Sequence, residues 1–411
     1  MTKIFSLKGK GLKFDTAADV ETYLRDLAAK SDVEAIDISG NTWGIDAVKS
    51  FAEVLKRCRS IKVCPTHQFQ PIETKDPQTV NLSDMFTTRK EWELPISLQA
   101  ILDALEDKPV FELDLSSNAL GPRCAPSLVS FITNNRSLQN FRMVDNGLGN
   151  EGGKIVAQAL YDAAINSKSD GRGKTQIKTL IISNNRLGWN METLADAEIW
   201  CKALEAHAST LEDVRLYQNT IRTPVMVGLI RALSKCKGLK HLDLSDNWLK
   251  VPGSKALATA LPNWTELRVL NISEDQILPR GGVIIAEALS KGPCPRLEEL
   301  NIKEAEVGEK AFIVLAQAIK GHFPKLIKLE VNGNYGSEED EWIEKLREAL
   351  DSHGNASALG DVDELEEYVE EEEEADEEEE EAEEKIEPPP KAAKGDVDDL
   401  ADLMGKTKIA A

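Results

Sequence analysis

The sequence feature that most constrains the fold is a short pattern that recurs through most of the chain. It consists of an apolar residue, one spacer, a second apolar residue, two spacers and then, in most copies, asparagine; Leu113–Asn118 is typical. The copies begin at Ile36, Val80, Leu113, Phe141, Leu180, Val214, Leu242, Leu270, Leu300 and Leu329. Their base spacing of 28 to 30 residues, with a few longer steps, predicts a repeat solenoid with insertions between some units.

Each copy of the pattern is followed by a segment of different periodicity. After the asparagine, apolar residues recur at helical spacing, as they do at residues 149–160. The first half of a repeat therefore predicts a strand and the second half a helix. We expect an α/β leucine-rich repeat horseshoe of the ribonuclease-inhibitor type, with parallel strands on its concave face and helices on its convex face.

The recurring asparagine has a structural explanation. Where a strand turns toward a helix, main-chain groups lose their ladder partners, and a buried side-chain amide can both donate to and accept from them. We therefore interpret the asparagines as structural first and look for function among their neighbours.

Residues outside the repeats indicate how the chain is organised. A solenoid needs an end unit to cover its first apolar face. A short hairpin or edge strand at residues 5–14, followed by an amphipathic helix through Val20, Leu24 and Leu27, fits that role. We expect an N-terminal cap at residues 1–35, about ten or eleven repeats at 36–355, and an acidic disordered tail at 356–411.

The negative charge is concentrated at the C-terminus. Of the net charge of −22, residues 361–411 account for −18 and the rest of the chain for −4. Self-repulsion and the lack of apolar surface predict disorder there. Such a tail either solubilises the protein or attracts a basic partner weakly. The overall balance gives no support to nucleic-acid binding.

Cysteine usage and hydropathy indicate a soluble protein of a reduced compartment. The six cysteines are scattered without paired spacing. The first residues lack the apolar run of a signal peptide, and no run of about 18 apolar residues predicts a membrane span. The five histidines are not linked to a nucleophile by any motif. We predict no cofactor, no metal site and no independent enzyme activity.

The repeat that begins at Val80 departs most from the pattern. Met85 stands where asparagine is expected, and the following turn offers an arginine. The run Asp84-Met-Phe-Thr-Thr-Arg89 resembles the Asp-x-Phe-Thr-x-Arg motif of the GTPase-activating proteins for the small GTPase Ran. The acidic tail and other similar stretches extend the resemblance along the chain: Phe5–Lys10, Ile38–Thr42, Asn146–Gly149, Asn185–Leu187, Gln218–Arg222 and Asn332–Asn334.

This resemblance implies a Ran-type small GTPase in its GTP-bound state as the partner. An activator either inserts an arginine that neutralises charge on the transferring phosphoryl group, or fixes the GTPase's own water-positioning glutamine. The resemblance implies the second route. Arg89 would then be important because it anchors the interface or its own loop.

The predicted site lies on one rim of the horseshoe, at the turns after the strands of about the second to sixth repeats. We assign the catalytic position to Arg89 and GTPase binding to Asp145, Asn146, Arg186, Asn219 and Arg222. Family members commonly carry Asn-Asn where this chain has Asp145-Asn146, and an asparagine of that turn is thought to lie near the GTPase active site. A carboxylate there would be repelled by the nucleotide unless it faces a cation or a protein donor.

The resemblance also suggests a role in nucleocytoplasmic transport and a Ran-binding protein as a further partner in a ternary complex. We expect a cytoplasmic location, with the periphery of the nuclear envelope as an alternative. The competing interpretation is an acidic leucine-rich-repeat adaptor or histone-binding chaperone. Such proteins usually have shorter repeats of about 23 residues with little helix, so the helical period argues against it.

Overall fold

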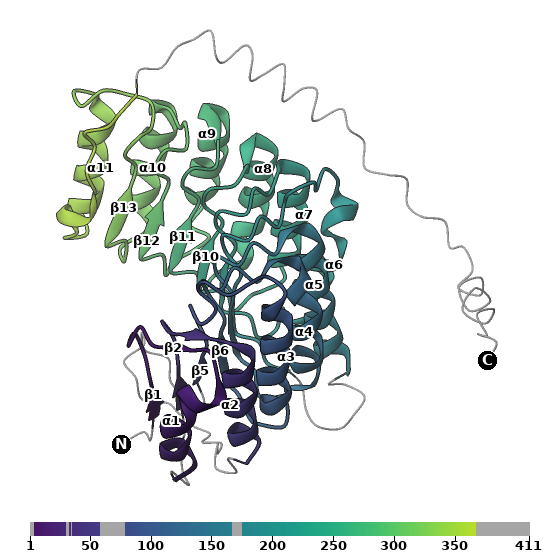
Figure 1. Cartoon of the computed structure of the whole chain (residues 1–411). Helices are drawn as coiled ribbons and strands as arrows, with labels where there is room; N and C mark the ends of the chain where they lie inside the picture. Colours follow the sequence, from purple (N-terminus) through teal and green to yellow (C-terminus); the bar gives the residue numbers. More distant parts are fainter. Residues whose placement is uncertain (1–3, 30–32, 34, 58–78, 167–174, 367–411) are drawn as a thin grey trace, which may run out of the picture. The chain divides into compact units, whose positions relative to one another are not determined.

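The computed structural model describes residues 4–29, 33, 35–57, 79–166 and 175–366. By its contacts the chain divides into Met1–Tyr368 and Val369–Ala411, and the second unit lies outside the described residues. The first unit is an 11-stranded sheet whose strands follow one another in chain order. Helices α1 to α11 alternate with these strands along the chain, and neighbouring helices lie side by side (Figure 1).

The strands of the main sheet are three residues long. They are β1 (Ile4–Ser6), β3 (Ala35–Asp37), β5 (Thr79–Asn81), β6 (Glu112–Asp114), β7 (Asn140–Arg142), β8 (Thr179–Ile181), β9 (Asp213–Arg215), β10 (His241–Asp243), β11 (Val269–Asn271), β12 (Glu299–Asn301) and β13 (Lys328–Glu330). A separate two-stranded sheet pairs β2 (Lys13–Phe14) with β4 (Thr42–Trp43).

The helices are longer than the strands. They are α1 (Ala17–Ala29), α2 (Ile45–Arg57), α3 (Glu93–Leu105), α4 (Gly121–Asn134), α5 (Gly149–Asn166), α6 (Glu198–Ala206), α7 (Thr223–Leu233), α8 (Lys250–Ala260), α9 (Leu278–Leu289), α10 (Glu309–His322) and α11 (Glu341–Asp351), with short 3₁₀ segments at Leu194–Ala197, Leu261–Asn263 and Ala356–Ala358.

The register of the sheet confirms the repeat pattern. Ile36 pairs with Val80, Val80 with Leu113, and each later pattern start with the next one, in parallel, through to Leu329. One further strand precedes them, because Phe5 pairs with Ile36. The segment at residues 5–14 therefore supplies a parallel edge strand and not a hairpin. The solenoid expected from the sequence is confirmed.

The core lies between the sheet and the helices. The paired strand centres are buried, and helix residues such as Leu128 and Phe131 belong to the same buried apolar cluster. Each fully buried leucine of this kind stabilises the fold by roughly 1.5–3 kcal/mol. Because neighbouring repeats share these contacts, the core extends along the solenoid.

An asparagine ladder runs along the turns that follow the strands. Asn118 is typical: its Nδ2 donates to the carbonyls of Leu82 and Leu115 at 2.8 Å each, and its Oδ1 accepts from the Met85 amide at 2.8 Å. The side chain is 2% exposed. The structural role expected for the turn asparagines is confirmed here, since one amide satisfies main-chain groups of two repeats.

The described chain continues beyond the last predicted repeat. Residues 356–366, expected from the sequence to belong to the tail, lie along β13. The Gly360 amide donates to the Leu329 carbonyl at 2.8 Å, and the Glu366 amide donates to the Asn334 carbonyl at 2.9 Å. Asn332 Nδ2 also donates to the Asp363 carboxylate at 3.0 Å. This segment covers main-chain groups that an open sheet edge would expose.

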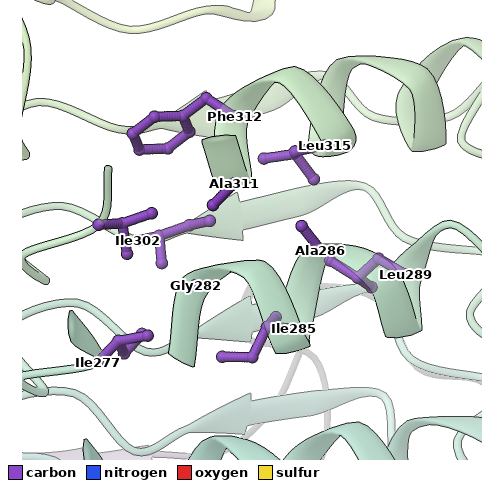
Figure 2. Close-up of a pocket in the computed structure, with 10 residues that line it drawn as sticks. Ile277, Gly282, Ile285, Ala286, Leu289, Ile302, Ala311, Phe312 and Leu315 are labelled. Carbon is purple, nitrogen blue, oxygen red and sulfur yellow. The ribbon is translucent and has the colours of Figure 1, made fainter. Parts of the chain in front are cut away.

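The packing between α9 and α10 leaves a small apolar void. Figure 2 shows side chains from both helices and from the neighbouring strand segments converging on it, among them Ile277, Ile302 and Phe312. Every residue that lines it is apolar. A ligand site needs a few convergent polar groups, so we interpret this void as a packing defect of the core.

Within the part of the chain that the structure describes, no helix combines the length and the apolar character that crossing a bilayer requires.

Candidate functional site

The turns that carry the ladder also present side chains to solvent. The backbone takes positive φ beside the buried ladder residues, and at Asn118, Asn146, Asn185 and Asn219 it does so on both sides, as at Asp145 (55°), Arg186 (55°) and Gln218 (55°). Positive φ is uncommon for residues other than glycine, and here the ladder holds it in place. The flanking side chains therefore project from successive repeats along one edge of the sheet.

Arg89 is mostly buried, and its guanidinium bonds within the protein. Its Nη1 donates to Asp15 Oδ1 at 2.6 Å, and its Nη2 lies 3.2 Å from the Phe14 carbonyl and 3.4 Å from that of Thr42. The side chain is 10% exposed. In this conformation Arg89 connects the Asp84–Arg89 turn to the N-terminal cap.

The Asp84–Arg89 turn follows β5 and bonds to segments of the repeats on either side. The Asp84 amide donates to the Ser116 carbonyl at 3.0 Å, while Thr42 Oγ1 donates to the Thr87 carbonyl at 3.1 Å. Thr87 Oγ1 donates to the Asp84 carboxylate within the turn. Met85 and Phe86 point into the core, which leaves Asp84, Thr87 and Thr88 exposed.

Asp145 lies exposed at the turn after β7 and faces a protein donor. Its Oδ1 accepts from Asn184 Nδ2 of the next repeat at 3.2 Å. This is one of the two situations in which a carboxylate at this turn can be tolerated near a nucleotide. The Asp145 amide donates to the Ser183 carbonyl at 3.1 Å, so the turn itself is part of the ladder.

Asn146 and Asn219 do not reach the surface. They are 1% and 0% exposed. Asn219 Nδ2 donates to the Ile182 and Leu216 carbonyls at 2.8 and 2.9 Å, and its Oδ1 accepts from the Asn185 amide at 2.9 Å. The hypothesis that these two side chains contact a GTPase conflicts with this burial, because the ladder already uses their donors and acceptors. They can shape the site only through the backbone that they hold.

Arg186 and Arg222 are exposed and lie near two exposed tryptophans. The Trp189 amide donates to the Arg186 carbonyl at 3.2 Å, and the Trp189 side chain is 61% exposed. The Arg222 guanidinium lies 4.6 Å from the ring centroid of Trp248, which is 39% exposed. Exposed tryptophan and arginine are the residue types that dominate protein interfaces.

The strand surfaces beside this edge carry paired charges. Arg142 lies 3.4 Å from Glu112, and Arg215 lies 2.8 Å from Asp213. Burial raises the pKa of the Glu112 carboxyl, and the nearby Arg142 opposes that rise. The Arg142–Glu112 pair joins β7 to β6 and stabilises the sheet locally, whereas Arg215 and Asp213 lie on the same strand, β9.

The described thiols and imidazoles do not form a catalytic set. Burial raises the pKa of Cys124, Cys236 and Cys294 to about 12 each, so they are neutral thiols at neutral pH. His207 is buried, which lowers its pKa, and its Nε2 lies 3.0 Å from the Leu160 carbonyl. Among the described residues, no group of three or more His, Cys, Asp or Glu is placed to hold a metal ion.

Comparison with known proteins identifies the family. A leucine-rich repeat model matches residues 235–258. The Ran GTPase-activating protein 1 of Saccharomyces cerevisiae is 30% identical over 354 residues, which are 85% of this chain and 82% of that protein. The chain belongs to the Ran GTPase-activating protein family. This confirms the resemblance noted from the Asp84–Arg89 run.

Other members of the Ran GTPase-activating protein family are longer. The Ran GTPase-activating protein 1 of Xenopus laevis is 33% identical over 360 residues, which are 86% of this chain and 57% of that protein. The Ran GTPase-activating protein of Drosophila melanogaster is 32% identical over 220 residues, which are 53% of this chain and 33% of that protein.

Among solved structures, the leucine-rich repeat protein LegL7 of Legionella pneumophila is 16% identical. The match covers 86% of this chain and 99% of that chain, with a TM-score of 0.43.

Three residues near the predicted site of this family member, Trp248, Trp189 and Asp15, do not belong to the motif or to the assigned turn positions. Trp248 directly follows the ladder residue Asn247, at a position whose counterparts Ala119 and Thr220 are also exposed. The repeat register could have shown that its ring points outward. Trp189 lies in a longer loop without such a register. Asp15 had no local signal, since its partner Arg89 is 74 residues away.

Proposed function

We propose that this chain stimulates GTP hydrolysis by a Ran-type small GTPase in its GTP-bound state. Identity of 30% to the yeast Ran GTPase-activating protein 1, over 82% of that protein, is the observation that carries the proposal. The chain would act as an activator, with the nucleotide and most catalytic groups belonging to the GTPase. A Ran-binding protein would join the same complex, and the protein would act in the cytoplasm.

The geometry favours positioning of the GTPase's own groups over insertion of an arginine. An inserted arginine must reach the transferring phosphoryl group, whereas the Arg89 guanidinium has acceptors on Asp15, Phe14 and Thr42 and is 10% exposed. The exposed row from Asp84 through Asp145 and Arg186 to Arg222 provides carboxylate and guanidinium groups along one edge. These groups can hold and orient a protein surface.

The test is single-turnover GTP hydrolysis by purified Ran with catalytic amounts of this protein and of the Arg89→Ala variant. We expect wild type to stimulate hydrolysis and Arg89→Ala to lower kcat/KM at least tenfold, roughly 1.4 kcal/mol of transition-state stabilisation. Arg347→Ala on α11 is the matched control, because that exposed side chain pairs only with Glu344 among the contacts that the structure gives it. If Arg89→Ala stimulated GTP hydrolysis as well as wild type does, the assignment of Arg89 to the site would be wrong.

Deletion of residues 367–411 separates the proposal from the adaptor or histone-chaperone alternative. A chaperone that depends on its tail loses histone binding with the deletion, whereas an activator that uses the exposed turns keeps stimulating GTP hydrolysis. In the described repeats the helices range in length from 9 residues in α6 to 18 residues in α5. That content departs from the short, helix-poor repeats of the alternative class.

A further inference from the structure

We propose that Asp15 is a positioning residue for GTPase activation, which holds Arg89 and thereby fixes the Asp84–Arg89 turn against the N-terminal cap. This inference rests on the proposed function and extends it to a residue outside the repeats. It starts from the ion pair between Arg89 Nη1 and Asp15 Oδ1, whose 2.6 Å separation is that of a strong charge-assisted hydrogen bond.

Asp15 is itself held in place. Its amide donates to Asp19 Oδ2 at 2.9 Å, and the Thr16 amide donates to the same oxygen at 2.7 Å, just before α1 begins. Lys13 Nζ lies 3.3 Å from the other carboxylate oxygen of Asp15. The hydrogen bond from Arg89 is the main cause that lowers the pKa of the Asp15 carboxyl. The Asp15 carboxylate is therefore a fixed, charged hydrogen-bond acceptor for the Arg89 guanidinium.

The backbone leaves a space for the guanidinium at Gly44. A Cβ atom added to Gly44 would lie 3.1 Å from Arg89 Nη1 and 3.0 Å from the Asp15 carbonyl, closer than most real Cβ contacts. Gly44 therefore allows β4, Asp15 and Arg89 to meet at one point. The Arg89 site is thus defined by the N-terminal cap as well as by the turn that carries the motif.

The turn needs such an anchor because its own conformation is strained. Asp84 has a φ of 48° and Thr88 a φ of 67°. A β-branched residue at positive φ is an outlier, and strain of this kind persists only where surrounding contacts over-determine it. Losing the Asp15 contact would let the turn adopt other conformations. The apparent affinity for the GTPase then falls in proportion to the fraction of turns that remain competent.

The experiment compares five variants in the Ran hydrolysis assay: Asp15→Ala, Asp15→Asn, Arg89→Ala, the double variant Asp15→Ala with Arg89→Ala, and Asp26→Ala. Asp26 is an exposed acid of α1 and supplies the same change of charge away from Arg89. We expect Asp15→Ala to raise the KM for the GTPase about fivefold with kcat retained, the upper range for a partly exposed ion pair. Asp15→Asn should fall between Asp15→Ala and wild type, and Asp26→Ala should match wild type.

The double variant decides whether Asp15 acts through Arg89. If it does, the double variant is no worse than Arg89→Ala alone, because the two residues form one unit. The inference would be overturned if the double variant lost activity by the product of the two single-variant losses. It would also be overturned if Asp15→Ala kept the wild-type KM while Arg89→Ala was impaired.

Hydrogen exchange in the free protein gives a readout that does not require the GTPase. The Arg89 amide donates to the Phe86 carbonyl at 3.0 Å within the turn. We expect Asp15→Ala to speed exchange at this amide and to leave the Asn219 amide unchanged. Failure of wild type to stimulate Ran would refute the proposed function alone, whereas unchanged exchange at Arg89 would refute the role of Asp15.

Discussion

Asp275 occupies the ladder position of asparagine, and replacing it with asparagine should stabilise the protein. Its side chain is fully buried. Its Oδ1 accepts from the Asn247 amide at 3.1 Å, but its buried Oδ2 has no hydrogen-bond partner. In the preceding turn the corresponding atom is Asn247 Nδ2, which donates to the Leu216 and Leu244 carbonyls at 3.1 and 2.6 Å. The carboxylate thus places an acceptor where the ladder requires a donor.

The magnitude follows from this mismatch. A buried polar group without its partner costs about 1–3 kcal/mol, so we expect Asp275→Asn to raise the free energy of unfolding by about that amount at neutral pH. Burial raises the pKa of Asp275 well above the ordinary 3.8. The folded state therefore binds this proton more tightly than the unfolded state, and wild-type stability falls as pH rises above the unfolded pKa.

The assay is urea unfolding of wild type and Asp275→Asn at a series of pH values between about 4 and 8. The difference in the free energy of unfolding between Asp275→Asn and wild type should grow as the pH rises, and should level off above the pKa that Asp275 has in the folded state. Because repeat proteins can unfold in parts, exchange of the Asn247 amide provides a local measure at the same site. Asp26→Asn is the control for loss of one carboxylate. A stability difference that does not change with pH, or a less stable Asp275→Asn, would refute the reasoning.

Two other substitutions test the turns that position the site. Asn219→Ala should lower the free energy of unfolding by about 2–4 kcal/mol, since it leaves the Ile182 and Leu216 carbonyls and the Asn185 amide without their partner; a thermal midpoint equal to wild type would contradict this. Gly188→Ala should destabilise by about 1–3 kcal/mol, because its Cβ would lie 2.2 Å from the Thr220 carbonyl oxygen; unchanged urea midpoints would show that the loop moves aside.

The solenoid could be predicted from the sequence because its signals are local and repeated. The same apolar positions recur in every unit, so the register from Ile36 to Leu329 follows from aligning them. The turn asparagines add a second alignment. The strand at Ile4–Ser6 lacks the complete pattern, which explains why the sequence suggested either an edge strand or a hairpin there.

The site was harder to predict because its contacts join distant residues. The sequence identified the motif that ends at Arg89 but not its acceptors, since Asp15 and Thr42 belong to other units. For Asn146 and Asn219 two roles were open, and burial decides for the ladder. Position within the turn, more than residue type, separates a structural asparagine from an exposed contact.

The ladder explains why the candidate contact residues lie where they do. Each buried ladder side chain holds its turn, and at Asn118, Asn146 and Asn219 the residues directly before and after it are exposed at that edge. Asp145 and Trp248 are of this kind, so their side chains can change with little effect on the core. Arg89 does not directly flank a ladder position; it ends the Asp84–Arg89 turn and bonds to the N-terminal cap. Substitution at Asp145 should therefore alter partner contact at constant stability, while substitution at Arg89 couples activity to the packing of the cap.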